Sequence, residues 1–144
     1  MHDKYFFDSN IWLYLFLEKG SRKSLIAKQY IEKSVLNNQI VISWQVINEI
    51  SVNLLKKGFT EQQVLSIVEW LYRIATIQDF TQKMLLKASS LREQYSISYW
   101  DSLIVAAALE ANCQLLYSED MQDGLKIKSL TIRNIFAKHY ICAP

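Results

Sequence analysis

The fold of this chain is decided by the segment Tyr5-Phe6-Phe7-Asp8-Ser9-Asn10. Its three consecutive aromatic residues predict a short strand that is buried on both faces. The polar run that follows is typical of a turn that caps a helix, and we expect that helix from Ile11 to about Glu18. A buried strand that leads directly into a helix is the first unit of an α/β fold.

The rest of the sequence repeats this alternation. Short apolar runs predict further strands at 40–42 and 114–117, an extended piece at 75–77 and one or two weak strands within 125–132. Apolar residues at helical spacing predict helices at 26–34, 44–57, 64–72, 84–91 and 103–109. Because no linker or repeat interrupts the pattern, we predict a single domain over residues 1–144. It should be an α/β three-layer sandwich, with a short parallel sheet flanked by helices on both faces.

Composition and motifs exclude several functions. The 144 residues are 51% apolar and carry a net charge of +2, which indicates a globular chain without a strong overall preference for polyanions. With only three glycines, the sequence contains neither a dinucleotide-binding loop nor a P-loop. The apolar run Ile11 to Leu17 is too short to span a bilayer, and the start of the chain does not resemble a secretory signal. We therefore expect a cytoplasmic protein that does not enter a membrane.

Acidic residues follow two of the predicted strands. Asp8 comes directly after the first strand, and Glu119 and Asp120 follow the strand that ends at Tyr117. Ligands of open parallel sheets bind beyond the carboxyl ends of the strands. These acids are therefore expected at one edge of the sheet.

Two further acids stand alone in apolar helices. Glu49 is the only charged residue from Trp44 to Leu55, where it forms a narrow polar stripe with Gln45 and Asn53 on a helix that we expect to be buried. Asp101 is the only charge from Ser98 to Leu109, at the start of a helix that is apolar all round. Burying an unpaired carboxylate costs several kcal/mol of folding free energy. We therefore expect both residues to have a partner that offsets their charge.

Local structural explanations exist for most of these acids. Asp8 fits a helix cap, Asp101 fits a capping box with Ser98, and Asp120 fits a turn. The four acids together favour a different explanation, because converging carboxylates need a cation and all-oxygen ligands favour Mg²⁺ or Mn²⁺ over zinc. Without the four acids the chain has 16 basic and 10 acidic residues, an excess of +6. Candidates for a phosphate-binding rim are Lys19, Arg22, Lys23, Lys126, Lys128, Arg133 and Lys138.

Four short motifs resemble the PIN-domain ribonucleases, and above all the VapC-type toxins of bacterial toxin–antitoxin pairs. They are Phe7-Asp8-Ser9-Asn10, Asn48-Glu49-Ile50, Tyr99-Trp100-Asp101-Ser102-Leu103-Ile104 with the alanine run that follows it, and Leu116-Tyr117-Ser118-Glu119-Asp120-Met121-Gln122-Asp123-Gly124. Their order and spacing match that family from Tyr5 to about Phe136. The chain has Ser118 where threonine is common in the family, which keeps the hydroxyl group.

The resemblance implies an endoribonuclease that depends on Mg²⁺ or Mn²⁺. Asp8, Glu49, Asp101 and Asp120 would be its catalytic and metal-binding acids, with Glu119 and Asp123 as alternatives for the fourth. Asn10 and Ser118 would support the site. The resemblance also implies an RNA substrate, a cognate antitoxin and a homodimer, and the bulky residues from Ile11 to Leu17 offer a surface for a partner.

Other functions fit parts of the same pattern. A phosphatase of the haloacid dehalogenase type needs a second acid at position 10, where this chain has Asn10. A non-catalytic α/β interaction module would use the acids only as helix caps. A PIN nuclease that processes RNA, or that acts on DNA, would share the same four acids.

Overall fold

The computed structural model describes residues 2–137, so Lys138 of the predicted basic rim lies outside the described residues. The elements are β1 (Tyr5–Phe7), α1 (Ser9–Leu17), α2 (Arg22–Leu36), β2 (Ile40–Ser43), α3 (Trp44–Lys56), α4 (Glu61–Ile74), β3 (Thr76–Gln78), α5 (Gln82–Gln94), α6 (Tyr99–Glu110), β4 (Leu115–Tyr117), β5 (Lys126–Ile127) and β6 (Leu130–Arg133). The predicted alternation of strands and helices is confirmed.

The sheet has the strand order β3-β2-β1-β4-β6-β5. The first five of these strands are parallel to their neighbours, and β1 lies inside the sheet, with Phe6 paired to Val41 on one side and to Leu116 on the other. Only β5 is antiparallel, because the hairpin that joins it to β6 is too short for a crossover connection. The parallel strands end at one edge of the sheet, and Asp8 and Ser118 come directly after two of them.

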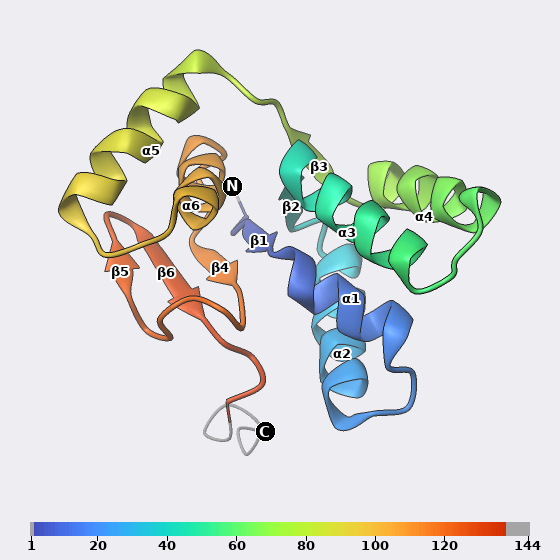
Figure 1. Ribbon diagram of the computed structural model, residues 1–144. Helices are drawn as coiled ribbons and strands as arrows, with labels where there is room; N and C mark the ends of the chain where they lie inside the picture. Colours follow the sequence, from blue (N-terminus) through green and yellow to red (C-terminus); the bar gives the residue numbers. More distant parts are fainter. Residues whose placement is uncertain (1, 138–144) are drawn as a thin grey trace.

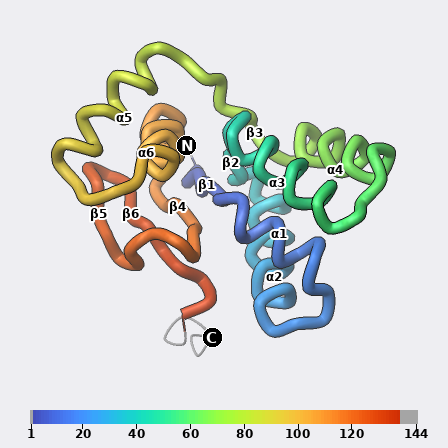
Figure 2. The backbone as a smooth tube through the Cα atoms, viewed as in Figure 1, coloured from blue at the N-terminus to red at the C-terminus, as the bar shows by residue number. Residues whose placement is uncertain are grey.

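Helices flank the sheet, as the sandwich prediction requires. Figures 1 and 2 show α5 and α6 side by side next to β4, β5 and β6, with α1, α2, α3 and α4 grouped on the other side of β1. Helix α6 is buried at seven consecutive positions, from Ser102 to Ala108. Its uniformly apolar sequence therefore reflects a place in the middle of the domain.

Helices α1 and α6 are among those that begin earlier than the sequence pattern predicted. Helix α1 begins at Ser9, because Asp8 is its N-cap and accepts a hydrogen bond from the Ser9 backbone N–H. Helix α6 begins at Tyr99, because Ser98 is its N-cap and accepts from the backbone N–H of Asp101. Polar residues that looked like turns before each helix are thus its cap and first turn.

The prediction that the helix around Glu49 is buried holds for one side of that helix only. Helix α3 packs against α1, α4 and β2, but Trp44, Val52 and Leu55 are 57%, 48% and 38% exposed. Its neighbours lie along one side only, so apolar residues on the other side remain open to solvent.

The most apolar helices are short. Helix α1 has 9 residues and α6 has 12, whereas a membrane-spanning helix needs about 20. Throughout residues 2–137, no helix combines the length and the apolarity needed to cross a bilayer.

The buried Trp12 should contribute strongly to stability. Its indole N–H donates to the Phe7 carbonyl at 3.2 Å, and its ring contacts Phe7 and Trp70. Trp12→Phe leaves a buried carbonyl without this donor and creates a cavity, and we expect it to lower the free energy of unfolding by about 3 kcal/mol in urea denaturation. The control Trp100→Phe, at a ring that is 63% exposed, should change it by less than about 0.5 kcal/mol. Equal effects of the two variants would contradict this packing.

Candidate active site

Asp8 lies at the carboxyl end of the central strand β1. Its side chain is only 5% exposed, and both carboxylate oxygens have partners. Oδ1 accepts from the Ser9 backbone N–H at 2.8 Å, and Oδ2 accepts from the Ser118 hydroxyl at 2.8 Å. Ser118 follows the neighbouring strand β4, so this bond joins two segments 110 residues apart in the sequence.

Asp120 and Asn10 join the same two segments a second time. The Asn10 amide donates to Asp120 Oδ2 at 3.0 Å, and its oxygen accepts from the Glu119 backbone N–H at 3.3 Å. The Asp120 backbone N–H in turn donates to the Ser118 hydroxyl at 3.3 Å. Asn10 and Ser118, predicted as supporting residues, thus contact two of the predicted acids.

Glu49 and Asp101 come from two different helices. Asp101 is half-buried in the first turn of α6, and Glu49 is half-buried on α3. The Gln45 amide donates to Glu49 Oε1 and to the Trp100 carbonyl, both at 3.3 Å. Gln45 therefore connects the helix that carries Glu49 with the helix that carries Asp101.

The four acids repel one another. The pKa of Asp8 is raised from 3.8 to about 7, first by burial and then by the charges of Glu49 and Asp101, while hydrogen bonds from Ser118 and Ser9 oppose the rise. Burial also raises the pKa of Glu49, and the charges of Asp101 and Asp120 add to it. The pKa of Asp101 is raised by burial and by Asp120. Among the described residues, no lysine or arginine contributes to any of these three shifts.

Glu119 belongs to a different set of contacts. Its carboxylate accepts from the Tyr14 hydroxyl at 2.6 Å and forms an ion pair with the Lys23 ammonium group. Lys23 also lies over the rings of Tyr14 and Phe136, with its nitrogen 4.8 and 5.6 Å from their centroids. Because Tyr14 and Lys23 already bind the Glu119 carboxylate, Asp120 is the better candidate for the fourth acid. Asp123, the other alternative, accepts from the Asn134 backbone N–H at 2.9 Å.

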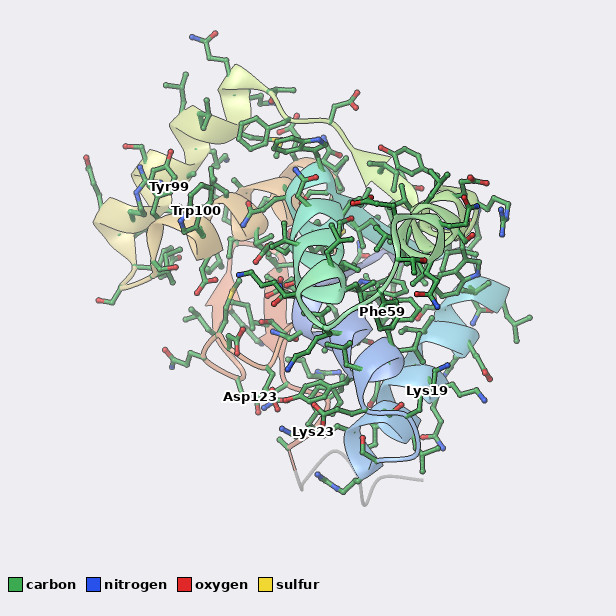
Figure 3. The ribbon with its side chains drawn as sticks, turned by 45° about the vertical axis from the view of Figure 1, so that its right-hand side comes forward. Lys19, Lys23, Phe59, Tyr99, Trp100 and Asp123 are labelled. Carbon is green, nitrogen blue, oxygen red and sulfur yellow. The ribbon has the colours of Figure 1, made fainter. Side chains whose placement is uncertain are left out.

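The predicted basic rim is only partly supported. Lys23 is paired with Glu119, and the Arg22 guanidinium donates to the Phe136 carbonyl at 2.9 Å, so both have structural partners. Figure 3 shows Lys19, Lys23 and Asp123 at the lower end of the molecule and Trp100 near its upper left. Lys126 and Lys128 are exposed on and beside β5. The cations thus belong to separate parts of the surface rather than to one ring.

The donor set fits a magnesium or manganese ion. It consists of carboxylate oxygens with surplus negative charge, which hard divalent cations prefer. Within residues 2–137, however, no three histidine, cysteine, aspartate or glutamate side chains are grouped closely enough to hold one ion together. Mg²⁺ typically uses one or two carboxylates and keeps several waters. An ion held here would therefore keep several waters in its coordination shell.

Two hollows adjoin these acids. One, of about 190 Å³, is lined by Asp101, Asp120 and the loop from Tyr95 to Ser98. The other, of about 390 Å³, is lined by Glu49, Gln45, Asn48, Trp44 and Trp100. Glu49, Asp101 and Asp120 are thus reachable from solvent, whereas the buried Asp8 lines neither hollow.

Sequence reasoning missed the bridging role of Gln45 and the two exposed tryptophans. Gln45 was visible as part of the polar stripe with Glu49, but the pattern did not show that its amide also reaches the Trp100 carbonyl on another helix. Trp44 and Trp100 carried no functional prediction, because the sequence does not show that both rings face solvent beside Glu49.

Comparison with known families gives this geometry a context. A family model described as the PIN domain matches residues 5–124. The chain belongs to the PIN domain family. No curated protein matches the sequence.

Solved structures of similar fold include toxin–antitoxin proteins. A toxin–antitoxin complex from Klebsiella pneumoniae is 25% identical, with 89% of this chain and 96% of that chain covered at a TM-score of 0.69. VapBC2 from Rickettsia felis, bound to a promoter DNA fragment, is 23% identical, with coverages of 90% and 97% and a TM-score of 0.68. VapC20 from Mycobacterium tuberculosis, a toxin that cleaves the sarcin–ricin loop, is 16% identical, with coverages of 81% and 92% and a TM-score of 0.65. The likeness to the VapC fold thus extends over most of the chain.

The pKa of Asp8 predicts how stability depends on pH. The folded chain holds this proton more tightly than the unfolded chain, so the contribution of Asp8 to stability is complete below about pH 4 and is lost as the pH rises through about 7. The Asp8→Asn variant has no carboxyl group to ionise at this position, so it does not lose stability in this way as the pH rises. In metal-free buffer we expect the variant to exceed the parent by roughly 4 kcal/mol in free energy of unfolding at pH 8, and to match it near pH 4. Asp79→Asn, at an exposed position outside the cluster, is the control. A variant that is less stable than the parent at pH 8 would show that Asp8 is stabilised as a charge.

Glu49→Gln tests the same repulsion at a second position. The variant keeps the size of the side chain and removes a charge that raises the pKa of Asp8. Metal-free at pH 8, we expect its melting temperature to equal or exceed that of the parent. A clear drop would identify Glu49 as half of a structural ion pair.

Proposed function

We propose that this chain is a metal-dependent endoribonuclease and the toxin of a toxin–antitoxin pair. The observation that carries the proposal is the electrostatic coupling of acids from separate segments. The charges of Glu49 and Asp101 raise the pKa of Asp8, and the charge of Asp120 raises the pKa values of Glu49 and Asp101. No lysine or arginine in the described part of the chain is among the causes of these three shifts. A helix cap acts on its own helix only, so acids that served only as caps would not need to lie close enough to repel one another. Membership of the PIN domain family and the likeness to toxin–antitoxin structures support the same function.

In this proposal Asp8, Asp101 and Asp120 hold Mg²⁺ or Mn²⁺, directly or through water. Ser118 orients Asp8 by donating to Oδ2, and Asn10 orients Asp120 by donating to its Oδ2. A bound divalent cation lowers the pKa of water and offsets the negative charge that grows on the phosphate during hydrolysis.

Glu49 is the proposed general base. Burial raises its pKa above the usual range, which makes it a better proton acceptor than an exposed glutamate. It takes a proton from the attacking water while the phosphorus–oxygen bond to the leaving nucleotide breaks. The Gln45 amide holds the Glu49 carboxylate in place during this step.

The proposed protein partners are a cognate antitoxin and a second copy of the chain, in the cytoplasm. An apolar hollow of about 740 Å³ between α1, α2 and α4 offers the antitoxin a surface, and its apolar lining consists of Leu15, Phe16, Leu25, Ile31, Ile67 and Trp70. Two of these residues belong to the bulky segment of α1 that the sequence singled out. Solved structures of similar fold were determined as toxin–antitoxin complexes.

The experiment that tests this function is cleavage of a labelled RNA with Mg²⁺ or Mn²⁺. Asp8→Asn and Asp101→Asn should each lower kcat/KM at least about 100-fold, since loss of one carboxylate costs several kcal/mol of barrier and each 1.36 kcal/mol is tenfold. Mn²⁺ should also raise the melting temperature of the parent and not that of Asp8→Asn.

Asp79→Asn is again the matched control and should cleave like the parent. Undiminished cleavage by both active-site variants would refute the proposal. Growth arrest on induction, absent with Asp8→Asn, separates a toxin from a PIN nuclease of RNA processing. A chain without any Mn²⁺ or Mg²⁺ effect on melting would be a non-catalytic module.

A further inference from the structure

Two tryptophans beside the acidic cluster are open to solvent. Trp44, at the start of α3, is 57% exposed, and Trp100, at the start of α6, is 63% exposed. Both line the hollow of about 390 Å³ that also contains Glu49. Ligand pockets have volumes of about 300–1,000 Å³, so this hollow is large enough for a ligand group.

Each of these rings is braced by another aromatic ring. Trp100 contacts Tyr99 edge-on at 5.2 Å between centroids, and the Arg92 guanidinium lies 4.6 Å from the Tyr99 ring. Trp44 contacts Phe80 edge-on at 6.4 Å. Figure 3 shows Tyr99 and Trp100 together at the start of α6. A ring that is fixed yet exposed is prepared for a partner, because little conformational entropy remains to be lost on binding.

The residues that line this hollow determine which kind of ligand can bind there. It offers two aromatic rings, the amides of Gln45 and Asn48 and one carboxylate, and no lysine or arginine contributes to it. The lining itself has no basic side chain to pair with a phosphate. A neutral, planar group with hydrogen-bond donors and acceptors fits this lining, because it stacks on the rings and pairs with the amides.

The hollow adjoins the candidate active site, because Glu49 is part of its lining. Trp100 lines this hollow, and the next residue, Asp101, lines the smaller hollow that contains Asp120. The Gln45 amide lies between α3 and α6, where it donates hydrogen bonds to both Glu49 and the Trp100 carbonyl. A polymer whose phosphate lies at Asp101 therefore has its neighbouring group within reach of Trp100.

We propose that Trp44 and Trp100 bind an unpaired nucleobase of the RNA, next to the phosphate that is cleaved. This inference rests on the proposed nuclease function and extends it to substrate selection. A base that stacks on these rings must be free of its own base pair, so the site favours single-stranded or looped RNA over duplexes. Asn48 and Gln45 are placed to contact the edge of that base.

The test measures RNA binding apart from cleavage. In the Asp8→Asn background with Mg²⁺, anisotropy of a short fluorescein-labelled single-stranded RNA should show that Trp44→Leu and Trp100→Leu each weaken binding at least about fivefold. Trp100→Phe, which keeps an aromatic ring, should stay within about threefold. Tyr72→Leu is the matched control, since Tyr72 is an exposed aromatic residue near Trp44 that does not line this hollow.

A second arm uses the same RNA with single abasic positions. One abasic position should weaken binding to the Asp8→Asn chain, and that penalty should disappear when Trp44→Leu and Trp100→Leu are combined. An unchanged penalty, or unchanged affinity in the tryptophan variants, would overturn the base site even if cleavage by the parent proceeds. Absence of cleavage by the parent would count against the nuclease function alone, because anisotropy still measures the base site.

The surface could instead join two copies of the chain. Sedimentation velocity separates the two roles. If the combined tryptophan variant and Tyr72→Leu both turn a dimer into a monomer while RNA affinity is unchanged, the patch is a self-association surface and the base site is refuted. An unchanged sedimentation coefficient with weakened RNA binding supports the base site.

Discussion

Mutual repulsion of four carboxylates is the constraint around which this structure is organised. Burial and the charges of neighbouring acids raise the pKa values of Asp8, Glu49 and Asp101, and Asp120 contributes its charge to the shifts of Glu49 and Asp101. Charges interact more strongly in such a partly buried environment than in water. Nothing in the packing of the core requires these charges to meet. A fold that brings them together is less stable without a cation than it would be with neutral side chains, which is the pattern expected of a site selected for chemistry.

The sheet and the helix caps hold the acids in spite of this repulsion. Strands β1 and β4 are neighbours and end at the same edge, so Asp8 and Ser118 meet across them. The N-terminus of α6 places Asp101 beside this edge, and the positive end of the helix dipole favours a carboxylate there. Lys23 and Glu119 fasten α2 to the loop that carries Asp120, which keeps that loop close to the site while Glu119 itself remains engaged.

Much of this arrangement could be predicted from the sequence. Apolar strands such as Ile40–Ile42 and caps such as Asp8 are local signals, and the bond from the Ser9 backbone N–H to Asp8 confirms the predicted helix cap. That Asp8 and Asp120 lie at the same edge of the sheet could be predicted, because the carboxyl ends of parallel strands lie at one edge. Contacts between distant segments could not be predicted. The prediction that α3 is buried failed on one side of the helix, because its sequence does not reveal that α1, α4 and β2 cover only the other side. The ion pair of Lys23 with Glu119 was not predicted either, because the two residues lie 96 positions apart in the sequence.

Anomalous diffraction from crystals of the full chain soaked in Mn²⁺ tests the central claim most directly. The account predicts a manganese peak within coordination distance of a carboxylate oxygen of Asp8 or Asp101, with the remaining acids of the cluster around it. Crystals in which those side chains show no manganese at saturating concentration, or in which each acid is paired with its own lysine or arginine, would contradict it.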